Sequence, residues 1–186
     1  MKNIFISLVS FSIVFNSCKE KKENSHEPVI SAISIIKGQL NHLDTSFYQI
    51  SKIETINGKT DTTYLKREEV RGLASDFLSL TDISQSNYSK NYMEERLIDE
   101  GQNILSITAT AKNEQQELQK QIIIIPLDEL ASGKVESIYI DRSVQIKDSS
   151  TQQKLFWQIG RYFQVVSIIQ KGSDPEIIHI RKVKWD

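Results

Sequence analysis

The chain has 186 residues, a formal net charge of −1, and hydrophobic and charged fractions of 39% and 25%. Such a length and composition fit one globular domain and argue against global disorder. The near-neutral charge argues against nucleic-acid binding, which requires a basic surface. No nucleic-acid partner is therefore expected.

The first eighteen residues combine a positive start with an apolar run. Lys2 precedes the apolar stretch from Ile4 to Phe15, and the small residue Ser17 directly precedes Cys18, the only cysteine of the chain. The run is too short to cross a bilayer as a stable helix, and its layout is typical of a secretory signal peptide. We therefore expect residues 1–17 to be removed as a signal peptide.

This layout resembles the signal of bacterial lipoproteins. The resemblance is carried by the apolar run, Ser17 and Cys18, and it covers residues 1–18 only. It implies cleavage ahead of Cys18 and acylation of that cysteine, for example with palmitate, so that the lipid anchors the protein to a membrane of the cell envelope. Phe15 departs from the family, which usually has an aliphatic residue at that position. Lys19, where some members have aspartate, implies transfer to the outer membrane.

The mature chain divides into a tether and a domain. Residues 18–27 are expected to be the lipidated cysteine followed by a flexible tether, because Lys19 to Glu27 is charged and lacks bulky apolar side chains. A disordered N-terminus without a tethering role would have the same composition. Residues 28–186 are expected to form a single α+β domain.

Two segments carry apolar residues at helical spacing. Pro28 begins the first segment, a favoured position for proline at a helix start. The apolar residues of this segment are Val29, Ile33, Ile36, Leu40 and Leu43. The second segment runs from Lys66 to Leu80, and its apolar residues are Val70, Leu73, Phe77 and Leu80. Both patterns predict amphipathic helices.

A hairpin is expected between these helices. The segments Phe47 to Ile56 and Lys59 to Leu65 have the character of strands, and Asn57-Gly58 separates them. Asn-Gly favours a type I′ turn, in which both central residues have positive φ. The same hairpin contains Asp61-Thr62-Thr63, which resembles an O-glycosylation acceptor of envelope proteins in some bacteria.

Strands dominate after Tyr92. The expected strands are Tyr92–Ile98, Asn103–Lys112, Gln116–Pro126, Lys134–Ile146, Lys154–Ile159, Tyr162–Lys171 and Ile177–Trp185. Their short connections join antiparallel neighbours. The run Ile122 to Ile125 predicts a strand that is covered on both faces. The expected fold is an antiparallel β-meander, forming a large curved sheet or half-barrel, with the two amphipathic helices packed on one face.

No motif predicts a catalytic, cofactor or metal site. His26, His42 and His179 share no metal-ligand spacing, and an acylated Cys18 cannot act as a nucleophile. The densest acidic cluster is Glu94, Glu95, Asp99 and Glu100. Its first two members would lie on opposite faces of a strand. A hydrolase would need a histidine or serine in a cleft with two or more of Glu94, Glu95, Asp99 and Asp141.

Aromatic residues gather near the C-terminus, at Phe156, Trp157, Tyr162, Phe163 and Trp185. Strand alternation sends neighbouring residues to opposite faces, so Phe156 and Trp157 should separate, as should Tyr162 and Phe163. Two interpretations follow from this separation. The group divides into core residues and stabilising cross-strand pairs, or the exposed part forms a platform for a sugar, lipid or peptide ligand.

The leading functional hypothesis is a non-enzymatic, membrane-anchored envelope lipoprotein that binds a protein partner or a small apolar ligand. One alternative is a carrier or chaperone for lipids or lipoproteins, with an apolar cavity. Another is a hydrolase of envelope polymers. A deep apolar pocket between sheet and helices would favour the carrier, whereas a filled core would favour the binding module.

The Cys18→Ala variant tests the lipid anchor. Because Cys18 is the only cysteine, the variant should lose all incorporation of a fatty-acid analogue during metabolic labelling, and the unmodified chain should be labelled. Equal labelling of the two chains would contradict acylation at Cys18.

Overall fold

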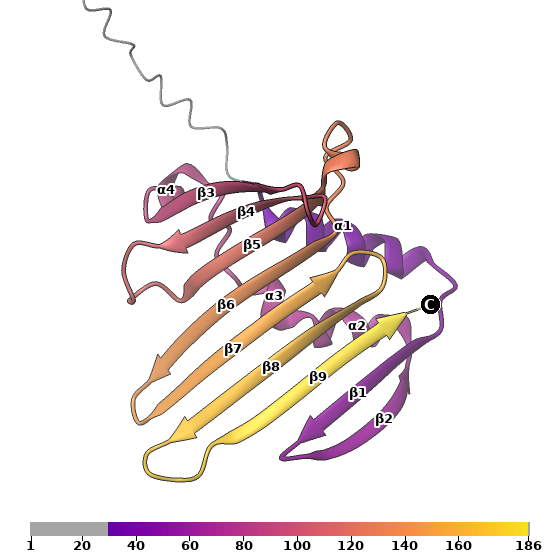
Figure 1. The fold of residues 1–186 in the computed structure, drawn as a ribbon. Helices are drawn as coiled ribbons and strands as arrows, with labels where there is room; N and C mark the ends of the chain where they lie inside the picture. The colour runs from indigo at the N-terminus through magenta and orange to yellow at the C-terminus, as the bar shows by residue number, and fades with distance from the viewer. Residues whose placement is uncertain (1–29, 186) are drawn as a thin grey trace, which may run out of the picture.

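The structure is a computed structural model that describes residues 30–185. These residues form a mostly β fold, with a nine-stranded antiparallel open sheet and a few short helices (Figure 1). The predicted signal peptide, Cys18 and the tether lie outside the described residues. No helix within residues 30–185 has both the length and the apolar character that a membrane span requires.

The elements follow one another with short connections. The helices are α1 (Ala32–Thr45), α2 (Arg67–Leu73), α3 (Ser75–Leu78), α4 (Ser86–Ser89) and the 3-10 turn η1 (Leu127–Glu129). The strands are β1 (Ile50–Ile56), β2 (Lys59–Leu65), β3 (Tyr92–Asp99), β4 (Ile104–Ala111), β5 (Leu118–Pro126), β6 (Ser137–Ile146), β7 (Ser149–Gln158), β8 (Tyr162–Lys171) and β9 (Ile177–Trp185).

The strand order in the sheet is β2-β1-β9-β8-β7-β6-β5-β4-β3. The predicted meander is confirmed, because β3 to β9 lie side by side in chain order. The N-terminal hairpin joins the sheet beside the C-terminal strand, because β1 pairs with β9. In this pairing Ile50 lies opposite Trp185. The sheet therefore has two open edges, β2 and β3, and it does not close into a barrel.

The β1–β2 turn confirms its prediction. Asn57 and Gly58 have φ values of 47° and 83°, which is the pair of positive values that a type I′ turn needs. In addition, the Asn57 side-chain oxygen accepts a hydrogen bond from the Ile178 backbone N–H at 3.2 Å. The local sequence thus forms the turn, and the hydrogen bond from Ile178 also holds the turn against β9.

Helix α1 begins at Ala32 rather than at Pro28, which lies outside the described residues. The side chain of Ser31 accepts a hydrogen bond from the Ser34 backbone N–H at 3.1 Å and so caps the helix. Its buried face matches the predicted stripe over the described part, with Ala32, Ile33, Ile36, Leu40 and Leu43 buried.

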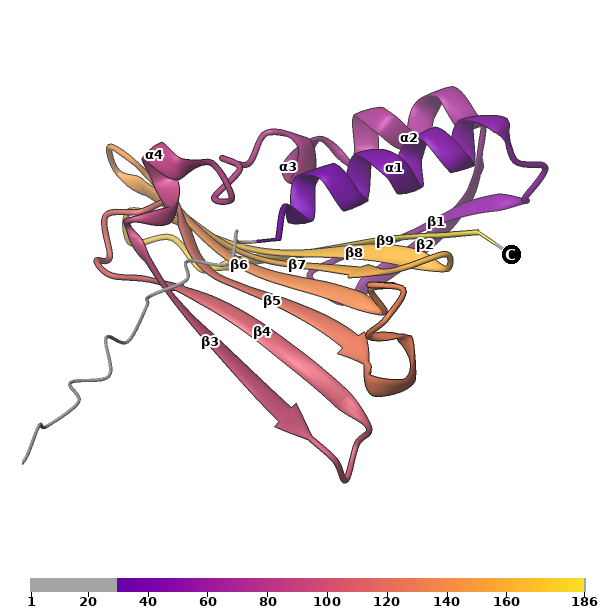
Figure 2. The same cartoon turned by 90° about the horizontal axis from the view of Figure 1, so that it is seen from above.

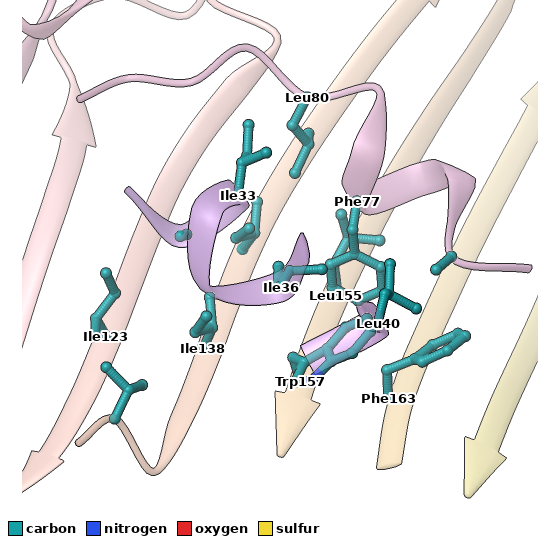
Figure 3. Packing of buried hydrophobic residues seen from close by; sticks show 14 of the residues in the cluster. Ile33, Ile36, Leu40, Phe77, Leu80, Ile123, Ile138, Leu155, Trp157 and Phe163 are labelled. Atoms are coloured by element: carbon teal, nitrogen blue, oxygen red, sulfur yellow. The ribbon is translucent and has the colours of Figure 1, made fainter. Parts of the chain in front are cut away.

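The second predicted helix, Lys66 to Leu80, is not one continuous helix. It is divided into α2 and α3 at Ala74, whose φ and ψ of −88° and 7° lie outside the helical range. Ala74 is fully buried. The chain changes direction at this residue, and the Phe77 side chain that follows packs against the sheet (Figure 3). Tertiary packing thus overrides the helical spacing, and the predicted arrangement of two amphipathic helices on one face is not confirmed as such.

The segments α1, α2 and α3 lie over one face of the sheet, whereas β3 and β4 turn away from them (Figure 2). The core fills the space between these helices and the sheet. Phe77 contacts Trp157 edge-on at a centroid distance of 5.1 Å and Phe163 at 5.6 Å, and Trp157 stacks on Phe163 at 4.9 Å (Figure 3). All three side chains are fully buried.

The isoleucine run is covered on one face only. Ile123 and Ile125 are buried on the helix side, but Ile122 and Ile124 on the opposite side are only half-buried. The expectation of a strand covered on both faces is therefore wrong. The reason is that all the long helical segments lie on the same side of the sheet (Figure 2). Apolar surface is consequently left on the helix-free face.

Two phenylalanines test the contribution of the core. Phe77 is fully buried among aromatic rings, whereas Phe47 is 95% exposed. Phe77→Ala should lower the free energy of unfolding by about 3–5 kcal/mol, because it removes buried apolar surface and leaves a cavity. Phe47→Ala should lower it by no more than about 1 kcal/mol, the value of an exposed contact with a cation such as Arg67. Denaturant titration of both variants measures the difference, and similar losses would contradict the proposed role of Phe77.

Candidate functional site

The late aromatic residues separate between the two faces of the sheet, as alternation predicts. Trp157, Phe163 and Trp185 lie in the core with at most 3% exposure, so they are unavailable to a ligand. Phe156 and Tyr162 lie on the helix-free face and are half-buried. Only these two members of the predicted platform can therefore meet a partner.

The strand register adds residues that the sequence did not single out. Tyr139 on β6 lies directly opposite Phe156 on β7, and Ile122 on β5 lies directly opposite Tyr139. The rings of Phe156 and Tyr162 are 5.7 Å apart. A row of half-buried apolar and aromatic side chains thus crosses four strands, β5 to β8.

A lysine on β9 extends this row. Lys182 places its Nζ 3.9 Å from the centroid of the Tyr162 ring, within the range of a cation–π interaction. We call the set Ile122, Tyr139, Phe156, Tyr162 and Lys182 the aromatic strip. Strand alternation alone could have placed Tyr139 on this face, but its alignment with Phe156 depends on the register of β6 and β7.

Tyr139 is held in one orientation by its neighbour on the same strand. Its hydroxyl donates a hydrogen bond to Asp141 Oδ1 at 2.6 Å. Burial, together with this carboxylate, raises the pKa of Tyr139 to about 12. The phenol consequently keeps its proton to a higher pH than an exposed tyrosine, and its ring contributes apolar surface to the face.

The strip lies in a positively charged surrounding. From β5 to β9 the helix-free face carries four lysines against one acidic residue; these residues are Lys120, Lys154, Lys182, Lys184 and Asp141. Asp141 lies between Lys120 and Lys154 in the strand register, so its charge is offset locally. The face therefore combines aromatic surface with a net positive charge.

A polar pocket of about 520 Å³ is lined by residues of β6 and β7 that follow or precede the strip along these strands. Asp141 and Lys154 belong to its lining, together with Glu114, Gln119, Arg142, Ser143, Gln152 and Gln153. Its lining of charged and amide side chains suits polar groups of a partner better than an acyl chain.

Titratable side chains of β1 and β9 form two groups of ion pairs on the helix side of the sheet. Glu54 accepts from Lys52 at 2.7 Å and lies 2.7 Å from His179 Nε2, and these two contacts, Lys52 first, lower the pKa of Glu54. Arg181 bonds Asp76 of α3, which also accepts from Gln153 at 3.1 Å. Positive and negative groups thus neutralise each other beneath α3.

This network does not form a nucleophilic site. Ser167 lies opposite His179 in the β8–β9 register, but its Oγ accepts a hydrogen bond from Gln153 at 3.1 Å. The imidazole Nε2 faces Glu54 instead. Activation of a serine by histidine requires a direct hydrogen bond between their side chains. Ser167 and His179 instead bond other residues, so their arrangement is that of a structural ion network.

The carboxylates that a hydrolase would need do not converge. Glu94 pairs with Arg96 at 3.0 Å on β3, Asp99 accepts from the Gln102 backbone at 3.0 Å, and Asp141 lies on β6. Two strands, β4 and β5, separate β3 from β6. Within residues 30–185, no group of His, Cys, Asp or Glu side chains has an arrangement that could hold a metal ion.

Asp61, Thr62 and Thr63 lie exposed on the edge strand β2. Their glycosylation stays a prediction.

Comparison of the chain with protein-family models, with curated proteins and with solved structures gave no match. The function must therefore be inferred from the geometry of the described residues.

The ionisation of Tyr139 gives a pH-dependent prediction. Between about pH 10, where an unfolded tyrosine ionises, and about pH 12, the folded chain retains a proton that the unfolded chain has lost. The contribution of Tyr139 to folding stability is therefore present below about pH 10 and decreases as the pH rises through this window.

Tyr139→Phe should remove this pH dependence and reduce the late part of the tyrosinate absorbance during an alkaline titration. Tyr64→Phe, on the exposed edge strand β2, serves as the matched control and should leave the late signal in place. An unchanged late signal in Tyr139→Phe would show that the phenol is not held by Asp141.

Proposed function

We propose that this protein is a non-enzymatic envelope lipoprotein, anchored through acylated Cys18, that binds a protein partner on the helix-free face of its sheet. The observation that carries the proposal is the aromatic strip, which is half-buried and accessible, whereas the opposite face is occupied by helices. The resemblance of residues 1–18 to lipoprotein signals supports the anchor, and Lys19 favours the outer membrane.

The filled core favours a binding module over a carrier. Fully buried side chains from α1, α3 and the sheet, including Leu40, Phe77 and Trp157, occupy the space in which a carrier would hold an acyl chain. The segments α1 and α2–α3 cover one face of the sheet with apolar side chains. The other face is then free to meet a partner.

The shape and charge of the strip favour a protein over a small apolar ligand. A row that crosses several strands offers a broad and shallow surface, whereas small apolar ligands require a concave pocket. Tyrosine and phenylalanine beside lysine are suited to a partner surface that carries aliphatic and acidic side chains. We therefore expect an acidic protein surface with an apolar centre.

Site-specific photo-cross-linking in cells tests this function. A photoreactive phenylalanine analogue in place of Phe156 or Tyr162 should give the same discrete adduct with one partner protein. The analogue in place of Tyr64, which is 72% exposed on β2, should not give that adduct. After the partner is identified, Tyr162→Ala should weaken its binding by roughly tenfold or more, as expected for an aromatic residue at the centre of an interface.

The charge of the face provides a second measurement on the same adduct. Replacing Lys154 and Lys182 by glutamate should reduce its yield, because these substitutions reverse one charge beside the strip and one within it. Equal adducts from positions 64 and 156, or no adduct from either position of the strip, would contradict a binding function for this face.

A further inference from the structure

Strand β3 is an open edge of the sheet that carries apolar side chains. Within residues 30–185 it pairs on one side only, with β4. Met93, Leu97 and Ile98 are 53%, 67% and 58% exposed. Figure 2 shows β3 at the border of the sheet, away from α1, α2 and α3. A long apolar edge of this kind is a template for pairing with another strand.

The backbone of β3 determines which residues would make the new hydrogen bonds. Next to the strand, the Asn91 carbonyl accepts from the Lys112 backbone N–H at 2.9 Å. Because these groups alternate in direction along an antiparallel strand, the N–H and C=O groups of Tyr92, Glu94, Arg96 and Ile98 are directed away from β4. An added strand would therefore bond to these even-numbered residues.

The side-chain order of β3 is self-complementary around Glu95. When the strand is paired antiparallel with a second copy of itself and Glu95 lies on the two-fold axis, Tyr92 meets Ile98 and Met93 meets Leu97. In the same register Glu94 meets Arg96, and by symmetry every pair occurs twice. We propose that β3 pairs with β3 of a second copy of this chain in this register, which joins the two sheets into one.

Alternative registers are less favourable. An axis at Arg96 places two arginines opposite each other and sets Glu95 against Leu97. An axis at Glu94 sets Glu94 against its copy and Met93 against Glu95. The proposed register has one like-charge contact, between the two Glu95 side chains, and compensates for it with two Glu94–Arg96 pairs and two pairs of exposed apolar residues, Met93 with Leu97.

Glu94 and Arg96 carry the charges that pair across the two-fold axis. Within one chain, Glu94 Oε1 accepts a hydrogen bond from Arg96 Nε at 3.0 Å. In the proposed pair, Arg96 of the second copy lies opposite Glu94, so two carboxylates and two guanidiniums meet around the axis.

The opposite edge lacks this complementarity. Strand β2 is exposed along Lys59 to Tyr64 and is mostly polar. Self-pairing around Thr62 would set Lys59 against Leu65 and Asp61 against Thr63, so it forms neither ion pairs nor pairs of apolar residues. The two edges thus differ, and β2 provides a matched control for β3.

Disulfide trapping in the full chain tests the register. The background is Cys18→Ser, which removes the only native cysteine. Residues on the axis form a non-hydrogen-bonded pair with Cα atoms about 4.5 Å apart, within the disulfide range of about 4.4–6.8 Å. Glu95→Cys should therefore give a covalent dimer under mild oxidation, roughly tenfold faster or more than Thr62→Cys on β2, since the pair has a high effective concentration.

Charge reversal provides the confirming arm. Within the Glu95→Cys chain, Arg96→Glu should suppress the dimer, and adding Glu94→Arg should restore it, with circular dichroism confirming that each variant folds. The proposal is overturned if the Glu95→Cys chain forms the covalent dimer no faster than the Thr62→Cys chain. It is also overturned if Arg96→Cys forms the dimer faster than Glu95→Cys, or if the main disulfide joins the chain to a different protein. None of these outcomes depends on a partner for the aromatic strip, so the proposed function is tested separately.

Discussion

The edge-on packing of Phe77 against the stacked aromatic rings of the sheet is the contact on which the arrangement of this protein depends. Phe77 meets Trp157 and Phe163, which come from neighbouring strands, and these rings in turn approach Trp185 on β9. One short helix thereby holds β7, β8 and β9 together from a single side. Because the helical segments α1, α2 and α3 all pack on this face, the opposite face of the same strands remains open.

The helices cover one face of the sheet, the closed face, and leave the other face open, so the two faces carry different kinds of side chains. On the closed face, apolar side chains fill the space below the helices, and the charged residues beyond them neutralise each other in pairs such as Arg181 with Asp76. On the open face, aromatic side chains share the surface with lysines. A surface with these properties suits recognition of an acidic protein partner, whereas the closed face is suited to stability.

The pairing of β1 with β9 decides where the sheet ends. It brings the N-terminal hairpin beside the C-terminal strand, so that β2 and β3 become the two edges. The edges then have different properties, because β2 is mostly polar and β3 exposes Met93, Leu97 and Ile98. A self-complementary apolar edge and an aromatic face on one sheet allow two separate contacts to form at the same time.

Local features of the fold could be predicted where local chemistry decides them. The Asn57-Gly58 turn, the apolar stripe of α1 and the alternation that separates Phe156 from Trp157 depend on φ preferences and on the periods of helix and strand. The meander followed from connections too short for a crossover. The resemblance of the N-terminus to a lipoprotein signal also rests on its own residues, and the cleavage and acylation that it implies stay predictions.

The remaining features depend on contacts between residues distant in sequence, which no local pattern encodes. The break at Ala74 follows from the position that Phe77 takes in the core, and the exposure of Ile122 follows from the placement of all the long helical segments on one side. The alignment of Tyr139 with Phe156 requires the register of two strands. The sequence by itself determined α1, the β1–β2 hairpin, the meander and the face to which each strand side chain points. Only the tertiary structure decided which face is open and which strands are edges, because burial is a property of the packed chain.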